Sequence, residues 1–196
     1  MKSYSQIGQD IFVQKLIGNL GYFVEIGGHL PDEINNTFML ENIGWSGISF
    51  DIVDYRKKWE IRRTPLFVEN CVTCDFIKIF NDKSVPSVVD YLSVDVELEG
   101  ERYKSLLNCW KANRKFKIIT IEHDSHVGFS ESEKKPQREF LTSQGYFLLF
   151  GDVTNKEGAS YEDWWINPEF FNMDDLIGMK SEGEYWVNII EKIKMI

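Results

Sequence analysis

The sequence has few cysteines, few histidines and no long hydrophobic run. Its 196 residues include three cysteines, an odd and small number that excludes a disulfide framework and is typical of a reducing compartment. Its apolar stretches are far shorter than the roughly 20 residues that a membrane-spanning helix needs. Its first residues lack the apolar core of a signal peptide. We therefore expect a cytoplasmic protein with no membrane partner.

Basic residues are also scarce, because 22 Lys and Arg face 31 Asp and Glu and leave a net charge of −9. A protein dedicated to nucleic acid needs a basic surface for the phosphates, so we expect no nucleic-acid partner. The chain is nevertheless 43% hydrophobic and 14% aromatic. A chain of this length buries roughly 70% of its unfolded surface. We therefore expect an ordered core in a single domain that spans residues 1–196.

Short apolar runs with strand character alternate with helical patterns along the chain. This alternation predicts βαβ units and a mainly parallel sheet with helices on both faces. The predicted strands lie at 22–26, 47–51, 66–70, 89–96, 116–122, 146–150 and 161–166. The predicted helices lie at 6–20, 35–42, 53–62, 102–112, 132–144 and 181–196. The expected fold class is therefore α/β, with a seven-stranded sheet.

Polar or glycine-rich residues follow several of the predicted strands. In parallel sheets, ligands bind outside the carboxyl ends of the strands, near the point where the strand order reverses. Gly27 and Gly28 would let the backbone approach a ligand closely, and Asp51 is placed to accept both hydroxyls of a ribose. The dinucleotide fingerprint G-x-G-x-x-G is absent, because Leu30 and Pro31 stand where it would continue. Its absence counts against a nicotinamide-dependent oxidoreductase.

Several motifs carry a family resemblance. Residues 5–52 include SQIGQDIFV and then YFVEIGGHLPDEINNTFMLENIGWSGISFD, and VDYLSVDVE, FKIITIEHD and YEDWWINPEFF follow. Together these segments resemble the FkbM-type family of S-adenosylmethionine (SAM)-dependent methyltransferases. The resemblance covers residues 3–172 and implies a Rossmann-like class I methyltransferase that uses SAM.

The resemblance also places cofactor-binding residues at the positions that match the family's motifs. It implies that the backbone at Gly27 and Gly28 runs alongside the methionine part of SAM. It further implies that Asp51 binds the ribose and that Asn70 meets the adenine. Three other motifs also match. Glu25 matches the strand-end acid, and Asn36 matches the first residue of an N-T pair. The leading motif, which closes over the cofactor, is matched by Gln6, Gln9 and Asp10.

Methyl transfer to a hydroxyl requires that the hydroxyl lose its proton to a base or to a metal. Asp95 ends the fourth predicted strand, and Glu122 and His123 end the fifth, so neighbouring strands would place them together. Two carboxylates and an imidazole form a candidate site for Mg²⁺ or Mn²⁺. Without a metal, His123 or His126 is the candidate general base, with Asp95 orienting it. In a third, structural alternative, Asp95 binds amino groups of the cofactor and His123 binds a loop backbone.

These residues together predict a SAM-dependent O-methyltransferase that methylates a sugar hydroxyl, free or in a glycan or glycoside. The alternative is a non-catalytic SAM- or nucleotide-binding module in a glycan-building assembly. Trp164 and Trp165, near Tyr161, suggest an aromatic wall for a sugar ring. Adjacent residues of a strand point to opposite faces, so only one of the two tryptophans would face the site.

Overall fold

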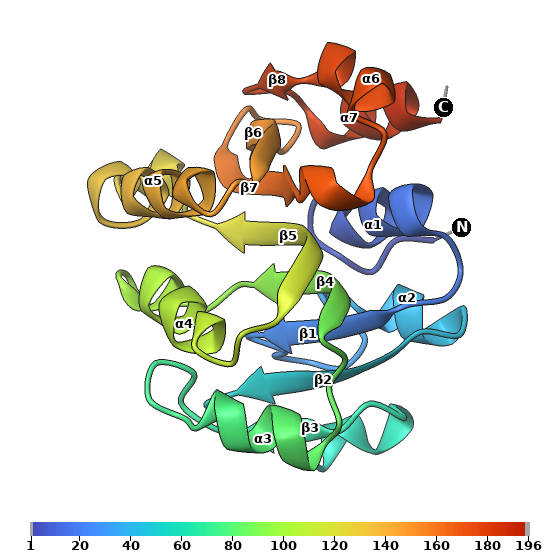
Figure 1. Cartoon of the computed structure of the whole chain (residues 1–196), viewed down its shortest axis with the longest axis vertical. Coiled ribbons are helices and arrows are strands. Elements are labelled where there is room, and N and C mark those ends of the chain that lie inside the picture. The colour runs from blue at the N-terminus through green and yellow to red at the C-terminus, as the bar shows by residue number, and fades with distance from the viewer. Residues whose placement is uncertain (1, 195–196) are drawn as a thin grey trace.

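The structure is a computed structural model that describes residues 2–194. One eight-stranded sheet runs through it in the order β3-β2-β1-β4-β5-β7-β6-β8 (Figure 1). The strands are β1 (Tyr22–Ile26), β2 (Ser46–Asp51), β3 (Leu66–Val68), β4 (Val88–Val94), β5 (Lys115–Glu122), β6 (Phe147–Thr154), β7 (Ser160–Ile166) and β8 (Ser181–Glu182). The α-helices are α1 (Gln9–Ile17), α2 (Phe38–Asn42), α3 (Phe76–Asp82), α4 (Glu101–Trp110), α5 (Lys135–Ser143), α6 (Met173–Leu176) and α7 (Trp186–Ile193). Shorter helical turns are η1 (Lys58–Ile61), η2 (Ser125–Val127), η3 (Ser130–Lys134), η4 (Pro168–Phe170) and η5 (Ile177–Met179).

The strand directions determine which residues meet at one edge of the sheet. Strands β1 to β5 pair in parallel, whereas β7 runs antiparallel to both β5 and β6. The strand order reverses at β1, which pairs with β2 on one side and β4 on the other. Because Glu122 at the end of β5 lies opposite Glu162 near the start of β7, the carboxyl ends of β1 to β5 and the beginning of β7 share one edge.

Helices cover both faces of the sheet with separate hydrophobic layers. Helices α3, α4 and α5 pack on one face through side chains such as Phe80, Leu106 and Leu141. Helices α1, α2 and α7 pack on the other face, through side chains such as Phe12 and Ile189. Figure 1 shows the two groups of helices on opposite sides of the stacked strands. The expected parallel α/β architecture is therefore confirmed.

The structure differs from the prediction in a few elements. All seven predicted strands form, and β8 adds a short eighth strand at the edge. The predicted helix at 53–62 is only the turn η1, in which Trp59 is the one buried residue. Helix α3 was not predicted, although Phe76 and Phe80 lie one turn apart and are both buried. The predicted closing helix extends to residues 195–196, which lie outside the described part of the chain.

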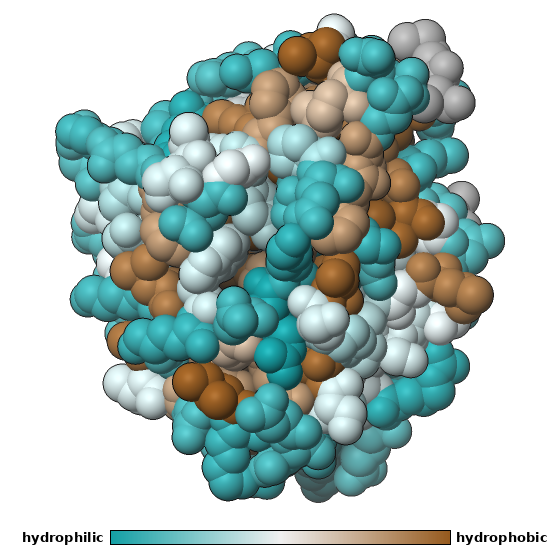
Figure 2. Space-filling model, viewed as in Figure 1, coloured by the Kyte–Doolittle hydropathy of each residue, from teal (hydrophilic) through white to brown (hydrophobic). Residues whose placement is uncertain are grey.

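Within residues 2–194, none of the helices has both the length and the apolar character needed to cross a membrane. Figure 2 shows hydrophobic residues in small groups separated by hydrophilic ones on one face of the molecule. Exposed large hydrophobic residues include Ile34, Ile52, Val53 and Leu98. These four belong to the wall of the cavity described below.

Replacing Phe12 should test how strongly α1 is held to the sheet. Its ring is fully buried and stacks on Trp164 of β7, with 4.5 Å between ring centroids. We expect Phe12→Ala to lower the free energy of unfolding by about 3–5 kcal/mol, because it removes a large core side chain and leaves a cavity. Urea unfolding measures the change. The control Leu20→Ala, at a side chain that is 75% exposed, should change the free energy by no more than about 0.5 kcal/mol.

Candidate functional site

A cavity of about 540 Å³ opens at the carboxyl edge of the sheet, where the strand order reverses. Its volume lies within the roughly 300–1,000 Å³ typical of small-molecule sites. The loops after β1 to β5 and the beginning of β7 form its wall. The predicted site residues that line it are Gln6, Gly27, Asp51, Asn70, Asp95 and Glu122.

Gly27 allows the end of β1 to approach the end of β4 very closely. Its φ of +91° is a conformation that side chains disfavour. A Cβ atom at this position would lie 1.6 Å from the carbonyl oxygen of Asp95, a distance that no real structure tolerates. The backbone N–H of Asp95 donates to the Ile26 carbonyl at 2.8 Å and completes the contact. Only glycine is therefore compatible with this corner of the cavity.

Asp51 presents a fixed carboxylate to the cavity. One of its oxygens accepts the backbone N–H of His29 at 2.8 Å, and the other accepts the backbone N–H of Val53 at 2.7 Å. An ionised carboxylate has about four lone-pair sites, so each oxygen keeps capacity for another donor. The ribose contact predicted from the sequence would use this remaining capacity of the two oxygens.

Asp95 and Glu122 form a carboxyl pair deeper in the cavity wall. Their side chains are in hydrogen-bonding contact, and Glu122 also accepts the Nε–H of Arg102 at 2.8 Å. Burial and the neighbouring Asp95 raise the pKa of Glu122 to about 10, and burial also raises the pKa of Asp95. Two carboxyl groups this close do not both ionise readily. The pair therefore holds a proton at neutral pH.

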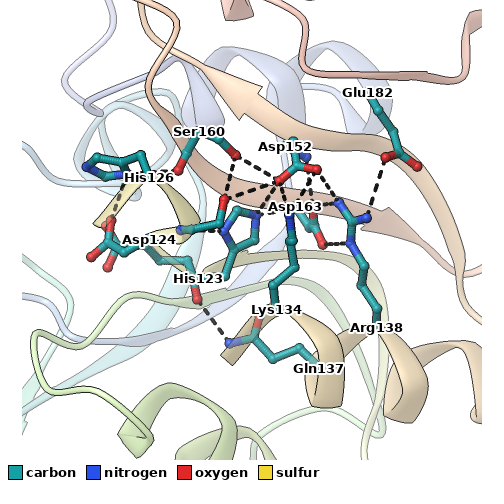
Figure 3. A network of polar contacts seen from close by, with 12 residues as sticks. His123, Asp124, His126, Lys134, Gln137, Arg138, Asp152, Ser160, Asp163 and Glu182 are labelled. Atoms are coloured by element: carbon teal, nitrogen blue, oxygen red, sulfur yellow. Dashed lines mark hydrogen bonds and ion pairs between the residues drawn. The ribbon is translucent and has the colours of Figure 1, made fainter. Parts of the chain in front are cut away.

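His123 does not join Asp95 and Glu122, so the structure does not assemble the predicted metal site. Consecutive residues at a strand end point to opposite faces, which separates His123 from Glu122. The His123 ring is fully buried, and its Nε2 faces Asp163 at 3.3 Å and Asp152 at 3.5 Å (Figure 3). Its Nδ1 accepts the backbone N–H of Ser125. The expected set of Asp95, Glu122 and His123 as metal ligands is corrected accordingly.

Within residues 2–194, one group of three His, Cys, Asp or Glu side chains has its candidate metal-ligand atoms within 4.8 Å of one another. The group consists of His123, Asp152 and Asp163. Two basic side chains already form ion pairs with the carboxylates of this group. Lys134 Nζ lies 3.0 Å from Asp152, and Arg138 Nε donates to Asp163 at 2.7 Å. Two carboxylates and two cations balance without an added ion, so this cluster does not fit a divalent metal.

Most of the leading motif, residues 5–10, holds the N-terminal segment in place and does not line the cavity. Gln9 Oε1 accepts the backbone N–H of Ile7 at 3.0 Å. Asp10 is fully buried and accepts hydrogen bonds from backbone amides and hydroxyls of residues 3–5. Of the three predicted residues in this motif, Gln6 alone reaches the cavity wall. Gln9 and Asp10 therefore hold the segment that carries Gln6.

Three other predicted cofactor residues also lie outside the cavity wall. Glu25 is buried and accepts the Ser49 hydroxyl at 2.6 Å. Asn36 is buried and donates its amide to Ser93 Oγ at 3.0 Å. The Cα of Gly28 faces Glu25 and the indole of Trp59. Glu25, Gly28 and Asn36 therefore lie behind the cavity wall, and their contact with a cofactor stays a prediction.

The antiparallel direction of β7 brings residues to the cavity that strand-end reasoning missed. Tyr161, at the beginning of β7, lines the cavity together with Asp124 and His126 from the segment after β5. A sequence pattern indicates a strand but not its direction, so Tyr161 had no positional signal. The aromatic wall predicted from Trp164 and Trp165 is wrong, because both side chains are buried in the two hydrophobic layers.

The cavity wall is strongly acidic. No Lys or Arg of the described residues lines it, while several carboxyl side chains do. A cleft lined by one sign of charge raises the local concentration of ligands with the opposite sign. The wall therefore favours a cationic ligand over a phosphate-rich one. The acidic lining residues are Asp51, Glu69, Asp95, Glu97, Glu101, Glu122 and Asp124.

Comparison with known proteins identifies the fold. No protein-family model matches the chain, and no curated protein does either. A solved structure from Clostridium thermocellum, provisionally assigned as an rRNA methylase, superposes with a TM-score of 0.55 at 17% identity, over 85% of this chain and 99% of that one. The chain has the class I methyltransferase fold. The mainly parallel sheet with helices on both faces agrees with the sequence prediction, whereas the strand order and the antiparallel direction of β7 were not predicted.

Two looser similarities have TM-scores below 0.5 and say nothing further about this chain. A Streptococcus mutans protein, provisionally assigned as a methyltransferase and solved with S-adenosylhomocysteine (SAH), gives 0.48 at 10% identity, over 85% of this chain and 98% of that one. Spermidine synthase from Thermotoga maritima gives 0.47 at 12% identity, over 98% of this chain and 73% of that one.

Glu25→Gln should separate a structural role for this acid from a cofactor contact. Burial raises the pKa of Glu25 to about 7, so the folded protein binds a proton that the unfolded chain releases above about pH 4.5. The stability of the wild type relative to Glu25→Gln should therefore fall by about 2 kcal/mol between pH 5 and 7.5 and then level off. Urea unfolding across this range measures the difference.

The same variant should keep the SAH affinity of the wild type in calorimetric titration, because Glu25 lies outside the cavity wall. Parallel pH profiles of the two proteins would contradict the raised pKa. A loss of SAH affinity without loss of folding would return Glu25 to the cofactor site.

Proposed function

We propose that this chain is a SAM-dependent O-methyltransferase of the FkbM type that methylates a hydroxyl of a sugar. The observation that carries the proposal is the position of the Asp51 carboxylate, held by two backbone amides at the wall of the cavity. The class I fold and the motifs that resemble the FkbM-type family support the same assignment. The cavity lies at the reversal of strand order, where sheets of this kind bind nucleosides.

The residues around the cavity fit SAM in several respects. Asp51 would accept the ribose hydroxyls, and Asn70 at the end of β3 would meet the adenine. Gly27 leaves room for a ligand beside the β1–β4 contact, because it carries no side chain. SAM has a net positive charge, which the acidic wall would attract. When bound, SAM would supply an electrophilic methyl group.

The opposite half of the cavity suits a hydroxyl-bearing acceptor without phosphate. The carboxyl pair of Asp95 and Glu122 offers hydrogen-bond partners for hydroxyl groups, and Tyr161 adds an aromatic ring beside them. The acidic wall would repel a phosphate backbone. These features support a sugar acceptor and argue against a nucleic acid.

Methyl transfer requires the acceptor oxygen and the methyl carbon to be aligned. Holding the reacting groups in place contributes roughly 7–11 kcal/mol in favourable cases. In the proposed reaction, Asp95 and Glu122 orient the acceptor while Asp51 and Gly27 fix the nucleoside. The proposal assigns no step to a metal, because Asp95, Glu122 and His123 are not brought together as a ligand set.

Asp51→Ala tests the cofactor site. Loss of the charge-assisted bonds to the ribose should cost about 1.5–3 kcal/mol, or about a 10- to 150-fold loss of SAH affinity. Calorimetric titration with SAH measures it. The matched control is Asp54→Ala, because this exposed acid lies three residues away, pairs with Arg56 and does not line the cavity. Equal affinity in both variants would remove Asp51 from the site.

Transfer itself is tested with SAM that carries a tritiated methyl group and a panel of methyl glycosides of hexoses and 6-deoxyhexoses. Label in a glycoside supports the proposal. SAH binding without label in any glycoside would contradict it and favour the non-catalytic module. Absence of SAH binding would overturn both. If SAH does not bind, a rise in melting temperature on adding NAD(P) would indicate a nicotinamide-dependent oxidoreductase instead.

A further inference from the structure

The imidazole side chain of His126 lines the acceptor half of the cavity. Its Nδ1 lies 2.9 Å from the Ser160 carbonyl oxygen. A carbonyl only accepts hydrogen bonds, so Nδ1 carries the hydrogen and Nε2 keeps its lone pair in the neutral ring. The ring packs against Tyr161, with 4.6 Å between centroids, and both residues line the cavity. An imidazole held in this tautomer is a ready proton acceptor.

A partly buried network of hydrogen bonds holds the turn that carries His126. Asp152 accepts the hydroxyl of Ser160 at 2.8 Å and that of Ser125 at 3.4 Å. Ser160 supplies the carbonyl that fixes His126, and Ser125 lies next to His126 in η2. Lys134 holds Asp152 from the other side at 3.0 Å. Figure 3 shows His126 at one end of this network and Arg138 and Glu182 at the other.

The other candidate bases are less suited to accept a proton. His123 is fully buried and turned toward Asp152 and Asp163. His29 lies in the nucleoside half, where its ring packs against Tyr55 and its backbone N–H donates to Asp51. Asp95 and Glu122 contact each other and Glu122 also accepts from Arg102, so this pair is engaged within the cavity wall.

We propose that His126 is the general base of the methyl transfer and that Asp152 is its positioning residue. This inference rests on the proposed O-methyltransferase function. The acceptor oxygen forms a bond to the methyl carbon as its proton passes to His126 Nε2. The bond from that carbon to the sulfonium sulfur breaks, its electron pair stays on sulfur and SAH forms. The His126 side chain is 26% exposed, so the proton then leaves to solvent.

The first test compares His126→Ala with the wild type, using the glycoside that accepts label in the experiment above. General-base catalysis contributes roughly 10²–10⁴-fold, so kcat should fall by about that factor while SAH affinity stays unchanged. Added imidazole should restore part of kcat, which a merely structural role would not produce. The control Val127→Ala changes the next residue of the same turn, which is exposed and outside the cavity wall, and should transfer normally.

The second test is a double-mutant cycle with Asp152→Asn. If Asp152 acts by positioning His126, Asp152→Asn should lower kcat in the wild-type background and have little further effect in His126→Ala. Equal losses in both backgrounds would overturn the positioning role.

The outcomes separate this inference from the proposed function. A wild type that transfers no label overturns the proposed function, before any variant is made, and this inference with it. A wild type that transfers label and a His126→Ala variant with the same kcat overturn the inference alone. Loss of transfer in Asp95→Asn with none in His126→Ala would assign the base to Asp95.

Discussion

The contact between the ends of β1 and β4 at Gly27 determines where a ligand can lie. The absence of a side chain lets the Gly27 backbone pass the Asp95 carbonyl, and the Asp95 N–H bonds to Ile26. This contact places the start of the β1 loop, the Asp51 carboxylate and the carboxyl pair of Asp95 around one cavity. A larger residue at this corner would separate β1 from β4 and disperse the groups that the cavity brings together.

Most of the sheet was predictable because each strand is a short apolar run with its own polar end. The seven predicted strands all form, and the covered faces follow from their continuous hydrophobic character. The helices were less predictable. The segment 53–62 is rich in charged residues and was predicted as a helix, but it forms only the turn η1, in which Trp59 is the one buried residue. Helix α3 depends on Phe76 and Phe80, whose spacing fits a single buried turn too short to stand out in the sequence.

Site residues could be predicted where they end a parallel strand. They could not be predicted where the direction of a side chain or of a strand determines which residues face the cavity. Asp51 and Asn70 follow directly from strand ends and line the cavity. Glu122 and His123 are adjacent in the sequence, yet one faces the cavity and the other a buried network, since neighbouring side chains alternate. Asp10 was assigned to the cofactor site because the leading motif resembles that of the family, whereas the backbone amides that bind its carboxylate cannot be seen in the sequence.

The reversed direction of β7 divides the cavity between two parts of the chain. The nucleoside half is built from residues before β4, whereas Tyr161 and His126 come from residues after β5. Under the proposed function, substitutions in the later segment would alter the acceptor while the earlier segment keeps its contacts with the donor. In that proposal, donor binding and acceptor choice are encoded in separate stretches of the chain, so one can change without rebuilding the other.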